Sequence, residues 1–245
     1  MQMIYRPRGA ALEYAPWACN LYRGCTHGCT YCYAPKCLWM SPEAFHESCV
    51  PRASALAKLR SDAESPAAPT NEHTLFCFTS DAYQPGATIT REALTIMAEH
   101  SLPFVVLTKA GDAAQRDFDL YSPGRDAFAV SLCWVSEDRM REHEPNAGSI
   151  AGRIAALEAA RSRGIDTWVS VEPVVEETQG VDAVRLACKV ADEVRIGKLN
   201  HVANTTNWHR FANAVADIVC DAGCRYVVKD ALRPFWPHGV PYVVR

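Results

Sequence analysis

Residues 24–34 read Gly-Cys-Thr-His-Gly-Cys-Thr-Tyr-Cys-Tyr-Ala, which places Cys25, Cys29 and Cys32 in the spacing C-x3-C-x2-C. A run this short can wrap as one compact loop around a single cubic iron–sulfur cluster. It supplies three thiolates for four irons, so one iron is left without a cysteine. An iron with an open position can hold a substrate or a cofactor, which indicates chemistry rather than plain electron transfer.

The composition is that of an ordinary globular protein of 245 residues, with 49% hydrophobic and 22% charged residues. The N-terminus lacks the apolar segment of a secretory leader, and no apolar run approaches the ~18 residues of a membrane helix. We therefore expect a cytoplasmic protein. Eleven cysteines in such a chain favour reduced thiols and metal ligation over a disulfide framework. The net charge of −3 gives no bulk attraction to nucleic acid.

Short apolar runs alternate with longer amphipathic stretches after the cysteine loop. A first strand is expected near 19–22, followed by strands at 75–79, 103–108, 127–133, 166–172, 193–197 and 225–229. Helices are expected near 53–60, 88–100, 112–120, 149–163, 181–191 and 208–222. Continuous apolar strands separated by helices predict parallel βαβ units. The expected fold is α/β, an open, partial parallel α/β barrel of about six βα units. The cysteine loop would follow its first strand.

Polar side chains stand where these strands end, which is the working end of such a barrel. Glu172 ends the fifth strand and precedes Pro173, so we expect it to face the cavity, although a solvated carboxylate is an alternative. Other polar residues follow the second, third and sixth strands or lie near the end of the fourth: Ser80, Asp81, Lys109, Ser131, Lys198 and Asn200. Ser80-Asp81 alone could start a turn, and a lone lysine could be solvated. Residues 204–209 are polar enough to bind a nucleoside or a sugar. Alternatively, they are the start of a helix, with Thr205, Thr206 or Asn207 as its N-cap.

A structural zinc site is the main alternative for the loop. Zinc usually takes four Cys or His ligands, often from two separated C-x2-C pairs. Here His27 would have to be the fourth ligand from inside the same turn, which is a cramped geometry.

At these residues the chain resembles the radical S-adenosylmethionine superfamily, whose signature is C-x3-C-x2-C with an aromatic residue, here Tyr31, before the last cysteine. Three patches further resemble the spore photoproduct lyase and DNA repair photolyase-like group: Tyr31-Cys32-Tyr33, Thr79-Ser80-Asp81 and Leu107-Thr108-Lys109. The resemblance implies a single partial-barrel domain over residues 1–245, with a core of about 15–230.

The same resemblance implies the cofactors and the residues that hold them. Cys25, Cys29 and Cys32 would ligate a [4Fe–4S] cluster, and S-adenosylmethionine would chelate its open iron. One electron would then cleave the sulfonium to give a 5′-deoxyadenosyl radical. The residues implied to contact S-adenosylmethionine are Tyr31, Ser80, Asp81, Lys109 and Ser131, to which we add Glu172 as a cavity-facing group. A carboxylate suits an ammonium, and a lysine suits a carboxylate.

The chain departs from the lyase pattern at the hydrogen donor. The lyase places a cysteine immediately before Thr-Ser-Asp, but Phe78 stands there and Cys77 lies one residue earlier. One step along a strand turns a side chain to the opposite face, so Cys77 is expected to point away unless a bulge re-aims it. Cys133 shares the face of Ser131 and could substitute, although both cysteines could simply be buried. Tyr33 matches a lyase tyrosine of a proposed hydrogen-transfer relay. The catalytic candidates are therefore Tyr33, Cys77 and Cys133.

We expect a radical S-adenosylmethionine enzyme that abstracts hydrogen from a nucleoside, a nucleobase or another small polar substrate. It would need an electron donor such as flavodoxin or ferredoxin, and no membrane partner is expected. One alternative is repair of a thymine photoproduct in DNA, as the lyase performs it. Another is a non-catalytic iron–sulfur or zinc binding module.

Overall fold

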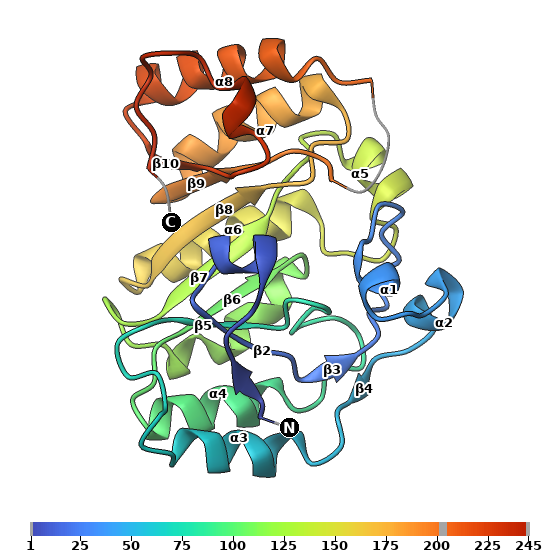
Figure 1. The fold of residues 1–245 in the computed structure, drawn as a ribbon, viewed down its shortest axis with the longest axis vertical. Coiled ribbons are helices and arrows are strands. Elements are labelled where there is room, and N and C mark those ends of the chain that lie inside the picture. The colour runs from blue at the N-terminus through green and yellow to red at the C-terminus, as the bar shows by residue number, and fades with distance from the viewer. Residues whose placement is uncertain (1, 201–204, 244–245) are drawn as a thin grey trace.

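The computed structural model of the chain describes residues 2–200 and 205–243. Its centre is one sheet with the strand order β1-β2-β5-β6-β7-β8-β9-β10 (Figure 1). These strands are β1 Ile4–Tyr5, β2 Trp17–Cys19, β5 Thr74–Phe76, β6 Phe104–Thr108, β7 Ala127–Ser131, β8 Asp166–Val171, β9 Glu193–Ile196 and β10 Arg225–Val228. Strand β1 runs antiparallel to β2, and the strands from β2 to β10 pair in parallel. The expected α/β fold with a mostly parallel central sheet is therefore confirmed.

Helices follow the parallel strands and cover one face of the sheet (Figure 1). The α-helices are α1 Ala34–Cys37, α2 Pro42–His46, α3 Ala55–Ala63, α4 Thr90–Glu99, α5 Glu137–His143, α6 Ile150–Ser162, α7 Glu177–Val190 and α8 Trp208–Ala222. The 3-10 helices are η1 Gly9–Glu13, η2 Gly111–Leu120 and η3 Arg233–Phe235. A separate small sheet joins β3 Tyr22–Arg23 to β4 Val50–Pro51.

Local signals account for several of these boundaries. Asn207 caps α8, because its side chain accepts a hydrogen bond from the backbone N–H of Arg210 at 3.0 Å. This confirms one of the caps expected in the polar stretch 204–209, of which Asn204 lies outside the described residues. Helix α7 begins at Glu177, earlier than the expected 181, and 111–120 form a 3-10 helix.

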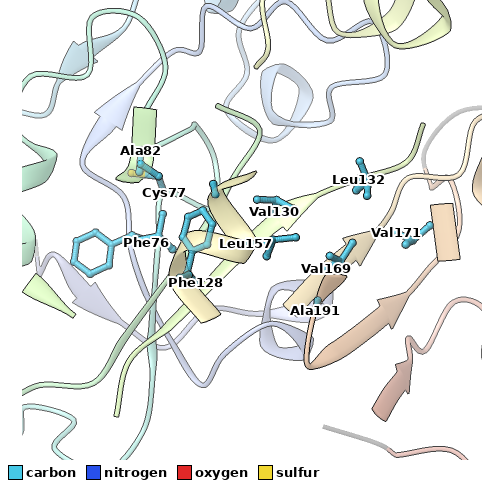
Figure 2. Close-up of a cluster of buried hydrophobic side chains, with 14 of the residues drawn as sticks. Phe76, Cys77, Ala82, Phe128, Val130, Leu132, Leu157, Val169, Val171 and Ala191 are labelled. Atoms are coloured by element: carbon cyan, nitrogen blue, oxygen red, sulfur yellow. The ribbon is translucent and has the colours of Figure 1, made fainter. Parts of the chain in front are cut away.

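Both faces of the parallel strands are buried, as their continuous apolar runs predict. Alternate residues such as Phe76, Phe128, Val130 and Val169 point to the helices and form the main hydrophobic cluster (Figure 2). The opposite face carries a smaller cluster of Ala15, Leu75, Val105, Ala127, Ala129 and Trp168. In Figure 1 the segment η1 lies in front of this second face. Side chains of the second face therefore surround an inner space.

The inner face becomes polar toward the strand ends because of the same two-residue alternation. Ser131 continues the series of Ala127 and Ala129, and Lys109 continues that of Val105. On β8 the series runs through Trp168 to Glu172. The alternation therefore delivers three predicted polar residues to the inner side.

One pair of cysteines departs from the expectation of reduced thiols. Cys188 on α7 and Cys224, just before β10, form a disulfide with their Cα atoms 5.5 Å apart. The two cysteines lie 36 residues apart in the sequence, so their spacing gives no sign that they meet in the fold. No helix formed by residues 2–200 and 205–243 has both the length and the apolar character needed to cross a membrane.

Candidate functional site

The cysteine loop follows β2 and β3 and is fixed by backbone contacts at both ends. Gly24 has φ +83°, and a Cβ there would lie 2.1 Å from the carbonyl oxygen of Ser48, so no other residue fits. The N–H of Cys25 donates to the carbonyl oxygen of Phe45 at 3.0 Å, and the N–H of Thr30 donates to that of His143 at 2.9 Å. The loop is therefore held between α2 and α5.

The loop closes one side of a cavity of about 350 Å³ at the carboxyl ends of the parallel strands. Its wall contains all three motif cysteines, the six predicted cofactor contacts, and Tyr33 and Cys77. Residues of separate strand ends are thus brought together as the barrel rule predicts. Cys133 is the predicted residue that stands outside this wall, since it is 2% exposed and packs in the main hydrophobic cluster.

The three thiols face the cavity from one loop, which suits a cluster better than a single ion. Burial raises the pKa of Cys25 and Cys32, and it raises that of Cys29 to about 12. Bound iron would therefore displace protons from all three. In the described part of the chain no three His, Cys, Asp or Glu side chains converge on one point as a ready metal site. A cubic cluster does not require that convergence, because each thiolate binds a different iron.

Asp81 ties the cysteine loop to the end of β6. It accepts hydrogen bonds from the hydroxyl of Thr108 at 2.7 Å, from the backbone N–H of Lys109 at 2.7 Å and from that of Tyr83 at 2.8 Å. His27 Nε2 lies 3.2 Å from its Oδ2. Burial would raise the pKa of Asp81, but His27 and these donors hold it well below its usual range.

These contacts bear on two expectations. A carboxylate has about four acceptor positions, and three hydrogen bonds together with the close approach of His27 Nε2 leave little of the Asp81 carboxylate open. Its direct contact with an ammonium therefore remains a prediction, whereas its contacts with the Lys109 backbone and with His27 of the loop are observed. His27, the fourth ligand of the zinc alternative, faces Asp81 with Nε2 and the carbonyl oxygen of Asn146 with Nδ1, at 3.2 Å.

Several polar groups of the cavity wall lack a strong partner among the described residues, and Ser80 and Lys109 are the predicted cofactor contacts among them. The Ser80 hydroxyl is buried without a hydrogen bond and has the weak Cys77 thiol as its side-chain neighbour. Lys109 forms none of the ion pairs found in residues 2–200 and 205–243, and its Nζ lies 5.9 Å from the centre of the Tyr31 ring. Burial opposes its charge, yet the Glu144 carboxylate raises the pKa of Lys109 above its usual value. The wall thus keeps a cation and a hydroxyl available to a ligand.

A buried ion pair behind the cysteine loop was not anticipated from the sequence. Arg153 on α6 binds the carboxylate of Glu144, and both side chains are 0% exposed. Arg153 also donates to the carbonyl oxygens of Ser131 at 2.8 Å and Gly148 at 3.1 Å. The Tyr31 hydroxyl donates to the other oxygen of Glu144. This network fixes the ring of Tyr31 and the end of β7, and it supplies the negative charge near Lys109.

A second network lies on the β8–β10 side of the cavity, and only some of its residues were predicted from the sequence. Glu172 accepts hydrogen bonds from the hydroxyl of Tyr14 at 2.5 Å, from the amide of Asn200 at 3.1 Å and from Lys229. The Lys229 ammonium also lies 3.6 Å from the centre of the Tyr14 ring. Lys229 directly follows β10, so the strand-end rule that selected Lys109 would have found it. Tyr14 follows η1 and carries no such signal.

The backbone around Cys77, the cysteine displaced by one residue from the lyase pattern, is not that of a regular strand. Strand β5 ends at Phe76, and Cys77 has φ +60°, a left-handed backbone that is unusual outside glycine. Both Cys77 and Phe78 consequently contribute atoms to the cavity wall. Burial raises the pKa of the Cys77 thiol to about 12. Phe78 packs between Tyr14 and Tyr33, with ring centres 5.7 Å from each, and the Tyr33 hydroxyl donates to its carbonyl oxygen at 2.7 Å.

Known proteins share this arrangement at the level of the fold. No protein-family model matches the sequence. Three uncharacterized proteins, from Mycobacterium bovis and two strains of Mycobacterium tuberculosis, are 28% identical over 182 residues, 70% of this chain. The match covers 53% of each, so the chain spans about half the length of these relatives.

Solved structures extend the likeness to most of the chain. Spore photoproduct lyase complexed with dinucleoside spore photoproduct superposes with a TM-score of 0.58 and 17% identity, over 87% of this chain and 63% of the lyase. A mutant of the lyase with bound AdoMet gives 0.59 at 16% identity over 88% and 63%. Streptococcus suis SuiB bound to S-adenosylmethionine gives 0.54 at 10% identity, over 67% of this chain and 41% of SuiB. The predicted resemblance is confirmed for the fold.

Proposed function

We propose that the chain is a radical S-adenosylmethionine enzyme whose cysteine loop binds a [4Fe–4S] cluster and whose cavity binds S-adenosylmethionine. One observation carries the proposal. Three cysteines of one loop share a cavity wall with the predicted strand-end residues, and two of those, Ser80 and Lys109, have no strong protein partner. Bound there, the cluster and S-adenosylmethionine supply one-electron cleavage of a sulfonium and a radical that abstracts hydrogen.

The wall residues have distinct roles in this proposal. Lys109 binds the carboxylate of S-adenosylmethionine, because its ammonium faces the cavity without an ion-pair partner. Ser80 and Ser131 offer hydroxyls to the polar groups of the cofactor. Asp81 positions Lys109 through its backbone N–H. The Tyr31 ring, held by Glu144, forms a flat surface for the adenine.

The substrate of the proposal is a nucleoside, a nucleobase or another small polar molecule. A cavity of about 350 Å³ is small, so it limits what can share it with the cofactor. The rings of Tyr14, Tyr33 and Phe78 form an aromatic wall suited to a planar ring and exclude water from it. Asn200 and Lys198 also line the cavity, but the Asn200 amide donates to Glu172 and the Lys198 ammonium lies 5.0 Å from the centre of the Phe235 ring.

Binding of S-adenosylmethionine to the reconstituted protein tests the cofactor assignment. Lys109→Ala and Ser80→Ala should weaken binding by roughly tenfold or more for the charged contact and less for the hydroxyl. Lys189→Ala, which removes an exposed lysine at the end of α7, serves as the matched control. Equal affinity in all three variants would remove Lys109 and Ser80 from the site.

Repair of a thymine photoproduct is a second candidate, and the backbone at Cys77 favours it. With this left-handed turn Cys77 contributes to the cavity wall, although its side chain is 2% exposed and packs in the main hydrophobic cluster, and the residue is displaced by one position from the lyase pattern. Its protonated form is the one that can donate hydrogen, and burial maintains that form. Incubation with dinucleoside spore photoproduct under reducing conditions should release thymine residues if repair is the activity. Complete recovery of the photoproduct would discard this candidate.

A further inference from the structure

The segment that carries the cysteine loop is charged differently from the rest of the chain. Residues 20–60 contain five Lys or Arg residues against two Glu, a net charge of +3, which leaves −6 on the remainder. This segment holds α1, α2, β3, β4 and the first part of α3, which carries Lys58 and Arg60, and α1, α2, β3 and β4 lie together at one side of the molecule in Figure 1. A positive patch on an acidic protein favours approach of a negatively charged partner.

A groove runs along this segment, separate from the site cavity. It has a volume of about 930 Å³, and its described lining contains Arg23, Arg52 and Lys58 but no Asp or Glu. Within residues 2–200 and 205–243, none of these three cations forms an ion pair, and Arg52 Nε is buried without a hydrogen-bond partner. The groove therefore has positive charge that the described fold does not neutralise.

Exposed apolar side chains lie on this groove or next to residues that line it, since Val50 lines it and Trp39 stands between the lining residues Leu38 and Met40. Trp39, between α1 and α2, is 96% exposed on a left-handed backbone with φ +54°. Val50 of β4, at 53%, is also exposed. Tryptophan is enriched at binding interfaces and is costly to leave in water, and arginine is the cation most enriched beside it. An exposed tryptophan beside unpaired cations is the composition of a contact surface.

A thin layer of side chains separates this surface from the cysteines. Leu38 and Met40, which flank Trp39 and line the groove, pack against a small hydrophobic cluster built on Cys25 and Phe45. Cys32 packs on the same cluster. A partner that covers Trp39 would thus sit one layer of side chains from two of the proposed cluster ligands.

We propose that Trp39 and the cationic groove, defined by Arg23, Arg52 and Lys58, dock a small acidic one-electron carrier protein. This inference rests on the proposed function, which needs one electron delivered to the cluster. The reduced carrier loses one electron and the cluster gains it, with no bond or proton transferred. Complexes of this kind are small and transient, so a few anchoring residues should dominate their affinity.

Two readouts with an acidic flavodoxin test the surface. The first is the dissociation constant of oxidised flavodoxin for the reconstituted protein, which involves no turnover. The second is the rate of cluster reduction by reduced flavodoxin, compared with the rate by dithionite, which needs no docking. Trp39→Ala and the double variant Arg23→Glu/Lys58→Glu are compared with two controls. Tyr242→Ala removes another exposed aromatic residue, and Lys189→Glu reverses a charge on α7.

The docking variants should raise the dissociation constant and slow reduction by flavodoxin by roughly tenfold or more, with reduction by dithionite unchanged. The controls should stay near wild type, and added salt should weaken binding to wild type more than to the charge-reversed variant. Equal flavodoxin binding in all variants would overturn the inference. So would a loss of self-association, rather than of flavodoxin binding, in Trp39→Ala. A wild-type protein that takes up no cluster would instead refute the proposed function itself.

Discussion

Removing Arg153 should destabilise the protein strongly, because it opens the buried network behind the cysteine loop. In Arg153→Met the Glu144 carboxylate, at 0% exposure, loses its main cation. The carbonyl oxygens of Ser131 and Gly148 also lose their donors. Breaking a buried ion pair from one side costs about 3–5 kcal/mol, and the unpaired carbonyls place this variant in the upper part of that range.

The matched control lies on the same helix. Arg161 pairs with Asp192 at 3.2 Å, but its side chain is 44% exposed, so Arg161→Met should cost under about 1 kcal/mol. Urea denaturation of both variants against wild type measures the free energy of unfolding. If Arg153→Met costs no more than Arg161→Met, the network does not support the site as described.

The pH dependence gives the same prediction an independent check. Burial alone would raise the pKa of Glu144, but Arg153, Lys109 and the Tyr31 hydroxyl lower it in the folded protein. A lowered pKa contributes stability above the unfolded value, about 4.3, that is lost as the pH falls through the folded value. In Arg153→Met the largest of these lowering contributions is removed, so burial raises the pKa of Glu144 relative to wild type. The stability gap between wild type and variant should therefore be widest near pH 7 and narrow toward pH 4. A gap that widens in acid would contradict this assignment.

Three further variants test other parts of the site. Gly24→Ala should destabilise the loop and lower iron uptake, because the new Cβ would lie 2.1 Å from the carbonyl oxygen of Ser48. Its control is Gly239→Ala, where φ is also positive, at +82°, but no atom lies near the new Cβ. This control should cost only about 1 kcal/mol and leave the iron content unchanged. Lys229→Met leaves the Glu172 carboxylate, 13% exposed, without its cation and should cost about 2–3 kcal/mol in thermal or urea unfolding, so a neutral result would show that Tyr14 and Asn200 suffice. Asp81→Asn should weaken the link that Asp81 forms between His27 and the backbone of Lys109. It should therefore weaken S-adenosylmethionine binding as Lys109→Ala does, even if Asp81 does not touch the cofactor. Unchanged binding would reject this positioning role.

The sequence could predict whatever depends on period and spacing. The alternation of apolar runs indicated the parallel strands, and the two-residue period placed Lys109, Ser131 and Glu172 toward one face. The cysteine spacing indicated the loop that could hold a cluster. The order of the strands indicated which polar residues would meet at their carboxyl ends. Cys77 shows the limit of that reasoning, because the strand ends one residue before it and a left-handed backbone replaces the alternation.

The missed residues depend on contacts between distant segments. Arg153 lies within a helix and Glu144 at the end of another, and nothing in their local sequence distinguishes them from solvated charges. They become a buried pair only because α6 packs under β7 and behind the loop. Tyr14 likewise meets Glu172 only after η1 folds across the inner face. Tertiary packing of this kind has no local signal.

The most direct test of the central proposal is the amount of 5′-deoxyadenosine formed by the anaerobically reconstituted, reduced protein supplied with S-adenosylmethionine. A radical S-adenosylmethionine enzyme should bind roughly four irons through Cys25, Cys29 and Cys32 and form 5′-deoxyadenosine, and Cys29→Ala should abolish that product. A colourless wild-type protein that holds one zinc ion and forms no 5′-deoxyadenosine would contradict the proposal.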